Sequence, residues 1–311
     1  MPDFTTYPRK FITYRWFRPI LVFILLAVFF FISDLLIIFI TALATGDINN
    51  VLDLATGGYD TLDAYTPVGV IVTLGGIAVM IPCLALANRI AGKRPFSSYT
   101  SSRGGWDFGI FFRCLLIAIV VCSLPIVVVQ VFMSDRDGAV RFTAAGFIML
   151  TIIGPLQCIA EEYVFRGFLM QTFGSWFRIP VLSIVCSAAL FAVVHAYNLI
   201  GIFGIFLSGV FYCLDTWFSG GIEASSAIHI ANNMTAFYTL GLGYGTLSSE
   251  TNWQSVVFLA VFEALYALII YACKKNGMFD RIKRDDAAVW NEKYNARIAE
   301  KETEYETVEF K

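Results

Sequence analysis

The segment EEYVFRG, residues 161–167, places two adjacent carboxylates and an arginine directly after the apolar stretch 144–160. Glu162 and Arg166 are four residues apart, so on a helix they share a face and can form an ion pair. That pairing lowers the cost of burying both charges. Glu161 lies about 100° further round the helix and is not neutralised by the pair. We therefore predict that Glu161 is free to act as a general base.

Both histidines of the chain lie in apolar segments, His195 in FAVVH and His229 in HIANN. At helical spacing, His195 shares a face with Phe191, and His229 shares a face with Asn233. Each histidine alone could be a core residue with satisfied hydrogen bonds. Because the two fall in such segments together, where ionisable residues are costly and mark functional sites, we interpret them as functional.

The stretch GSWFRIP, residues 174–180, predicts a turn between two helices, because glycine and proline favour one. A turn centred on Arg178 places Glu161 and His195 17 residues away on either side. In an antiparallel hairpin they would lie at the same depth, roughly 25 Å from the turn. His229 lies only eight residues past the next apparent turn. Either that turn dips into the protein or these boundaries are misplaced.

The composition predicts that lipid is the main solvent of the chain. Hydrophobic residues make up 58% and charged residues 15%, with a mean hydropathy of +0.70, whereas a soluble domain is nearer half apolar and a quarter charged. A spanning helix needs about 20 apolar residues. The candidate spans are 19–43, 67–90, 109–133, 142–173, 180–197, 199–216, 222–243 and 254–273. The predicted fold is an all-α polytopic membrane protein with about eight transmembrane helices.

Lysine and arginine are concentrated in the loops that an inside amino terminus would place in the cytoplasm. Only two of the 22 basic residues, Arg136 and Arg141, fall in outside loops. We predict that both termini are inside. The predicted organisation is a basic N-terminal segment (1–18), a membrane domain (19–273) and a charged tail that is helical or disordered (274–311).

The other charged residues of the predicted spans are interpreted as structural. Asp34 and Glu263 stand alone in their spans, and Arg113 is near enough to an inside end to snorkel. Asp215 and Glu223 flank the loop TWFSGG and are expected to touch water. The seven cysteines contain no CxxC, and we interpret them as small buried hydrophobes, not as disulfides or metal ligands.

Taken in order, EExxxR at 161–166, FxxxH at 191–195 and HxxxN at 229–233 resemble the motifs of the CAAX protease and bacteriocin-processing family (CPBP, also called Abi) of intramembrane endopeptidases. The resemblance covers roughly 142–243, about a third of the chain, and includes both histidines. The layout of eight spans is similar to the membrane core of that family. The acidic C-terminal tail is not part of the resemblance.

The resemblance implies that the catalytic site consists of Glu161, Glu162, Arg166, His195, His229 and Asn233. Glu161, with His195, would hold and deprotonate a water molecule that attacks a peptide carbonyl. His229 and Asn233 would stabilise the oxyanion. The second glutamate, held by the arginine, would shape the site.

Two histidines and one carboxylate could also form a catalytic zinc site with an open position. The chain lacks HExxH, in which one helix supplies two ligands and a base. If zinc took both histidines, the oxyanion role of His229 would need another donor. We favour a mechanism that requires no cofactor and keep zinc as the alternative.

Two further classes of function compete with a protease. Buried Glu, Arg and His also mark transport pathways, although no inverted repeat is present, and a non-catalytic membrane scaffold could retain the motifs. We expect a peptide or membrane-protein substrate within the lipid bilayer and no nucleic-acid partner. Short loops indicate a prokaryotic plasma membrane, while the natural substrate, its prenylation and the oligomeric state are left open.

Overall fold

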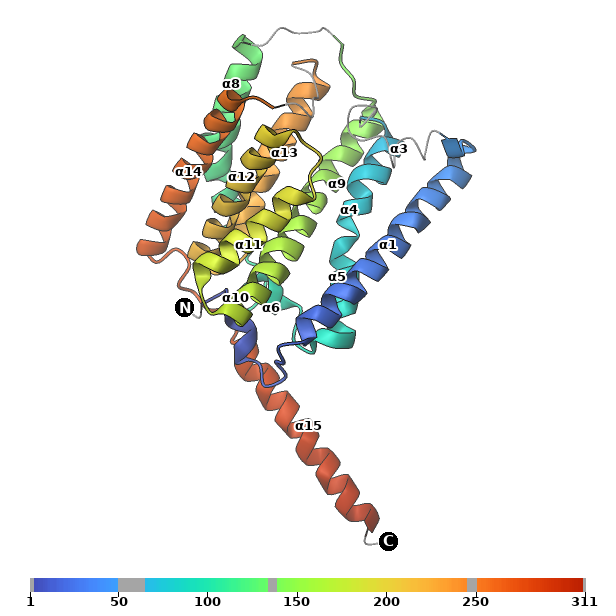
Figure 1. Ribbon diagram of the computed structural model, residues 1–311, viewed down its shortest axis with the longest axis vertical. Helices are drawn as coiled ribbons and strands as arrows, with labels where there is room; N and C mark the ends of the chain where they lie inside the picture. Colours follow the sequence, from blue (N-terminus) through green and yellow to red (C-terminus); the bar gives the residue numbers. More distant parts are fainter. Residues whose placement is uncertain (1–2, 50–64, 134–138, 245–250, 310–311) are drawn as a thin grey trace.

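The computed structural model describes residues 3–49, 65–133, 139–244 and 251–309, and within these ranges the chain is helical and contains no β-strand. Arg136, one of the two basic residues predicted outside, lies beyond these ranges. Six helical stretches are long and apolar enough to cross a membrane (Figure 1): Arg18–Thr45, Pro67–Gly92, Phe108–Phe132, Ala144–Phe177, Leu199–Ser219 and Trp253–Lys275. The predicted all-α polytopic membrane fold is confirmed.

Three of these stretches consist of α-helical and π-helical segments placed end to end. The first contains α3 (Pro67–Val70), η3 (Ile71–Gly75), α4 (Gly76–Ala78), α5 (Met80–Ala87) and η4 (Asn88–Gly92). The next contains α7 (Phe108–Ala118), η5 (Ile119–Ser123) and α8 (Leu124–Met133). The last contains α9 (Ala144–Glu162), η6 (Tyr163–Met170) and α10 (Gln171–Phe177). π-Helical turns are rare in proteins, and those that occur often lie at functional sites. The π-helix η6 begins directly after Glu162.

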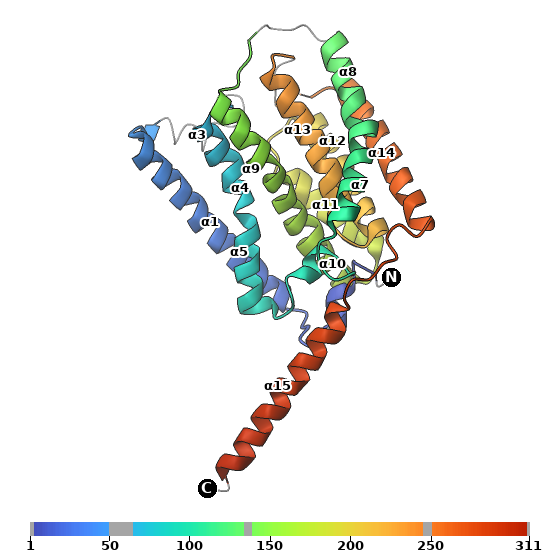
Figure 2. The ribbon, with the colours of Figure 1, turned by 180° about the vertical axis from the view of Figure 1, so that it is seen from behind.

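The other two predicted spans correspond to helices that do not meet the same criterion. α11 (Pro180–Val193) has only 14 residues, and α13 (Glu223–Gly241) carries polar residues along its length. α13 lies within the bundle, where it contacts α7, α9 and α12 (Leu199–Ser219), as Figure 2 shows from behind. Because protein rather than lipid surrounds it, α13 can carry polar side chains at membrane depth.

Lipid is the natural solvent for the outer face of the bundle. α1 (Arg18–Thr45) packs on α5 at one edge, and α14 (Trp253–Lys275) packs on α12 at the other. Phe31 and Leu43 on α1 are 64% and 69% exposed, which is one sign of an apolar surface too extensive for a soluble monomer. α1 ends at Gly46, whose left-handed φ of +71° suits glycine.

The turn predicted around Arg178 is present. α10 ends at Phe177, Arg178 adopts a left-handed φ of +59°, and α11 starts with Pro180 in its first turn. Proline is favoured there because its missing N–H has no helical acceptor to lose. The turn therefore reverses the chain between α10 and α11, which contact each other.

The turn between α12 and α13 is buried instead of facing water. The N–H of Ile222 donates to a backbone carbonyl of α6 (Ser97–Thr100) at 2.8 Å. Glu223 forms an ion pair with Arg103 at 2.8 Å. Asp215 and Glu223 are both fully buried, so the expectation that they touch water is wrong: α6 and the residues after it cover the turn. Of the two alternatives stated above, a turn that dips into the protein is the one observed.

The N-terminal segment packs against the start of the last helix. α15 (Asp286–Glu309) extends away from the bundle, so the predicted tail is helical over this range. Near its start, Asn291 donates to the carbonyl of Lys10 at 2.9 Å and accepts from the N–H of Ile12 at 2.8 Å. Trp290 donates to the hydroxyl of Thr13 at 3.2 Å.

Candidate active site

A buried ion pair forms the base of the candidate site. Arg166 Nη1 lies 2.9 Å from Glu162 Oε1, and both side chains are fully buried. The pair crosses from the last residue of α9 into η6, and Arg166 also donates to the carbonyl of Gly209 on α12 at 3.3 Å. The predicted pairing of these residues is therefore present in the structure.

His229 on α13 contacts both glutamates. Its Nδ1 lies 2.9 Å from Glu162 Oε1, and its Nε2 lies 3.4 Å from Glu161 Oε2 and 3.3 Å from Asn233 Nδ2. An ionised carboxylate only accepts hydrogen bonds, so Nδ1 of His229 is the donor to Glu162. Neutral His229 then presents the Nε2 lone pair to the Asn233 amide. Glu162 thus orients His229, a contact that links α9 to α13.

Aromatic rings enclose this cluster. The ring centroids of Phe191 and Tyr212 lie 6.0 and 5.2 Å from that of His229. The Arg166 guanidinium carbon lies 4.3 Å from the Phe191 centroid and 5.1 Å from the Tyr212 centroid, distances that allow cation–π attraction. The ion pair is therefore kept apart from both lipid and water by rings that also hold the imidazole.

A second layer of polar residues was not identified from the sequence. Asn232 Nδ2 donates to the hydroxyl of Tyr212 at 3.0 Å and to Glu263 Oε1 at 2.9 Å. Glu263 on α14 is fully buried, so the isolated glutamate of its span has a partner on α13. Nothing in the sequence links Tyr212, Asn232 and Glu263, because they lie on three different helices.

His195 lies at the edge of the cluster. It follows the end of α11 at Val193, so it lies just outside the helix rather than within a span as predicted. Its Nδ1 is 2.6 Å from the carbonyl of Phe191, and the two rings are 4.6 Å apart. Among the contacts of the described residues, none joins His195 to Glu161. The hairpin prediction misplaced His195 because α11 stops before it and the chain turns toward α12.

In the described part of the chain, the two histidines considered above as zinc ligands already have protein partners. Among the described residues, no three His, Cys, Asp or Glu side chains are grouped so that they could hold a metal. Each ring nitrogen of His229 is already next to a side-chain partner, and His195 is held by a backbone carbonyl. All seven cysteines are free thiols.

Comparison with known proteins connects this cluster to a family. Residues 143–235 match the family model described as type II CAAX prenyl endopeptidase Rce1-like. A relative from Bacillus subtilis (strain 168), the "Uncharacterized protein YyaK", is 31% identical over 239 residues, which cover 71% of this chain and 76% of the relative. The chain belongs to the Rce1-like family.

The Rce1-like match runs from the residue that caps α9, Thr143, to Thr235 on α13. All six candidate residues lie within it. The resemblance to CAAX-type intramembrane endopeptidases is thereby confirmed. No solved structure matches the chain at a significant level.

Proposed function

We propose that this Rce1-like protein is an intramembrane endopeptidase that hydrolyses peptide bonds of membrane-associated substrates through a glutamate-activated water. One observation carries the proposal: Glu161 and Asn233 both face Nε2 of His229, at 3.4 and 3.3 Å. A carboxylate base, an amide donor and an imidazole therefore converge on one point. A buried ion pair holds the imidazole from behind.

The proposed reaction begins with a water molecule bound to Glu161. Its oxygen attacks the scissile carbonyl carbon, while its proton passes to Glu161 and the carbonyl oxygen becomes an oxyanion. The amide of Asn233 donates to that oxyanion. The proton then moves on to Nε2 of His229, which becomes a second donor, and it is returned to the leaving nitrogen as the C–N bond breaks.

Glu162 supports this step without touching the substrate. The carboxylate of Glu162, which accepts a hydrogen bond from Nδ1 of His229, stabilises a positive charge on that imidazole, as in a catalytic triad. Arg166 keeps that carboxylate ionised and in place. Glu162 and Arg166 are therefore positioning residues, and Glu161, His229 and Asn233 are the groups that face the reacting atoms.

His195 is assigned a role in holding the water. The carbonyl of Phe191 can only accept, so Nδ1 of His195 is the donor at 2.6 Å, and in the neutral ring Nε2 is left as an acceptor. That acceptor can receive the second O–H of the water bound to Glu161. The half-buried position of His195 leaves its ring partly accessible at the edge of the buried cluster.

The substrate class we propose is a lipid-anchored or membrane-inserted peptide. The description of the family model names a prenyl endopeptidase, so prenylated C-terminal peptides belong in the first panel. Peptides with other lipid anchors and peptides without any anchor belong in the same panel. The reaction needs no cofactor in this scheme.

The deciding experiment compares wild type with Glu161→Gln, both purified in detergent, on that panel, with new peptide termini read by mass spectrometry. The matched control is Glu292→Gln, which makes the same change at an exposed position of α15. We expect cleavage by wild type and control and at least a hundredfold loss in Glu161→Gln. Equal cleavage by all three would exclude Glu161 as the base. Transport across vesicles by wild type without cleavage would favour a carrier.

A further inference from the structure

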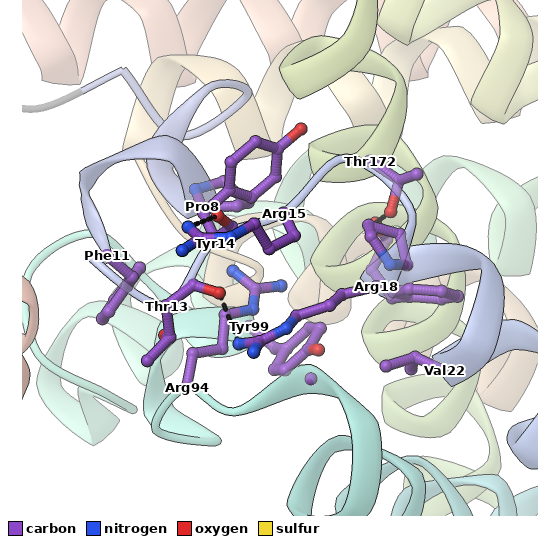
Figure 3. A pocket seen from close by; sticks show the side chains of 13 residues that line it. Pro8, Phe11, Thr13, Tyr14, Arg15, Arg18, Val22, Arg94, Tyr99 and Thr172 are labelled. Carbon is purple, nitrogen blue, oxygen red and sulfur yellow. Dashed lines mark hydrogen bonds between the residues drawn. The ribbon is translucent and has the colours of Figure 1, made fainter. Parts of the chain in front are cut away.

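A cationic pocket lies at the start of α1, away from the candidate active site. It is formed between the N-terminal segment, α1, the end of η4 and α10. Figure 3 shows the side chains of Arg15, Arg18 and Arg94 converging on it, with Thr13 and Tyr99 in its wall. Apolar lining comes from side chains such as Val22 on α1.

The three arginines are bonded only in part. Arg15 donates to the carbonyl of Tyr14 at 2.8 Å, Arg18 donates to the carbonyl of Thr13, and Arg94 donates to Gln171 at 2.6 Å. Each guanidinium has five N–H donors, so most of these donors remain available.

None of the residues that line this pocket carries a carboxylate. Among the described residues, no carboxylate lies within 4.0 Å of any of the three guanidinium groups. Asp286, on the same side of the bundle, is instead paired with Arg284 at 2.5 Å. Arg94 is only 9% exposed and its guanidinium carbon lies 3.6 Å from the Tyr99 ring centroid. A buried cation of this kind is expected to have a negatively charged partner.

The surroundings of the pocket are those of a membrane interface. Trp16 is 66% exposed, and Trp176, whose indole donates to the carbonyl of Trp16, is 37% exposed. Exposed tryptophans gather at the level of lipid headgroups. The apolar side chains of Ile20 and Leu21, 40% and 44% exposed, follow directly on α1. A lipid whose headgroup sits in the pocket would find an apolar surface for its acyl chains.

We propose that this pocket binds the phosphate-bearing headgroup of an anionic phospholipid, with Arg15, Arg18 and Arg94 as its cationic ligands. Arginine matches phosphate oxygens in pairs of hydrogen bonds. The basic N-terminal side of the bundle is the side that the distribution of lysine and arginine assigns to the cytoplasm, where anionic headgroups attract basic residues. A lipid is favoured over a soluble anion because Ile20 and Leu21, which are exposed and apolar, follow the lining residues Arg18 and Pro19 directly on α1.

Lipid occupancy tests the proposal without reference to cleavage. The full chain is reconstituted with phosphatidylglycerol or phosphatidylcholine of identical acyl chains, and retained lipid is counted by native mass spectrometry. The test variant is Arg15→Gln/Arg18→Gln. The matched control is Lys275→Gln/Arg281→Gln, which removes two exposed charges on the same side of the bundle. A single variant, Arg15→Glu, covers the case in which the double variant does not fold, since Arg15 is exposed and bonds only to carbonyls of its own turn.

We expect wild type and control to retain phosphatidylglycerol in preference to phosphatidylcholine. The affinity should fall at least tenfold in the test variant and in Arg15→Glu. Equal retention of the two lipids by wild type, or an equal loss in test and control variants, would overturn the proposal. A third arm adds inorganic phosphate at constant ionic strength. Displacement of phosphatidylglycerol by millimolar phosphate would identify a soluble anion as the ligand and would also overturn it.

Discussion

Glu162 Oε1 accepts a hydrogen bond from Arg166 Nη1 and another from His229 Nδ1, both at 2.9 Å. One carboxylate oxygen thus joins the cation that permits its burial to the imidazole that we propose faces the reacting atoms. Under that proposal, the chemistry of the site and the stability of the bundle depend on the same atom.

Glu162→Gln should affect stability and activity together. It leaves Arg166 buried without its counter-ion, and breaking a buried pair costs about 3–5 kcal/mol. The double variant Glu162→Gln/Arg166→Gln removes both charges and should recover part of that loss, while activity stays low because His229 has lost its anchor. Thermal unfolding in detergent measures the first effect and peptide cleavage the second. A double variant as unstable as the sum of its singles would show that the two side chains do not interact.

The ring of Tyr212 should matter more than its hydroxyl. The ring packs on His229 and Arg166 at 5.2 and 5.1 Å, whereas the hydroxyl accepts a hydrogen bond from Asn232. We expect Tyr212→Ala to lower kcat by at least tenfold through loss of His229 orientation. Tyr212→Phe should retain most of the rate. Equal losses in the two variants would place the effect in the hydroxyl and its link to Glu263.

Removal of metal ions should leave cleavage unchanged, because no group of three suitable donors occurs among the described residues. The measurement is the cleavage rate before and after dialysis against a chelator, with metal content determined by mass spectrometry. Untreated enzyme with added zinc serves as the control for inhibition. A rate that falls on dialysis and returns with zinc would contradict this prediction and restore the zinc alternative.

The contribution of Asp107 to stability should depend on pH. This residue caps α7 and pairs with Lys283 at 3.1 Å. Burial raises the pKa of its carboxyl, but hydrogen bonds from the N–H of Ile110 and from Lys283 outweigh burial, so the pKa lies below its usual value of 3.8. A carboxyl whose pKa is lower in the folded state than in the unfolded state stabilises the fold at pH values above its unfolded-state pKa. That stabilisation is lost as the pH falls through its folded-state pKa.

Asp107→Ala should therefore be less stable than wild type by about 1 kcal/mol at neutral pH. The difference should narrow below about pH 4. Melting curves of the two proteins from pH 3 to pH 8 measure it, and a gap that widens with acidity would reverse the assigned sign.

Local geometry was predictable from the sequence, whereas long-range contacts were not. Glu162 and Arg166 are four residues apart, and helix geometry alone brings them together. The contact between Glu162 and His229 spans 67 residues, so helix geometry could not relate the two, and the family resemblance placed both in one site without predicting their contact. His195 was misplaced because the end of α11 at Val193 carries no strong sequence signal.

Burial was misjudged where loops fold back onto the bundle. Asp215 and Glu223 border a glycine-containing turn, and residues beside such a turn are normally expected to be exposed to water. The structure covers this turn with α6, and Arg103 neutralises Glu223. Arg103 lies in the loop after α6, more than a hundred residues before Glu223 in the chain. Helical periodicity cannot relate two residues so far apart.

The contact between the N-terminal segment and the start of α15 has a consequence for the order of synthesis. Ile12 and Lys10 leave the ribosome before any membrane helix, yet their partner Asn291 is made after all of them. Until then, the backbone groups that Asn291 satisfies must be hydrated. A nascent chain halted after α14 could insert its helices but would keep this N-terminal segment open. The contact between α15 and the N-terminal segment can therefore form only in a chain whose membrane domain has already been translated.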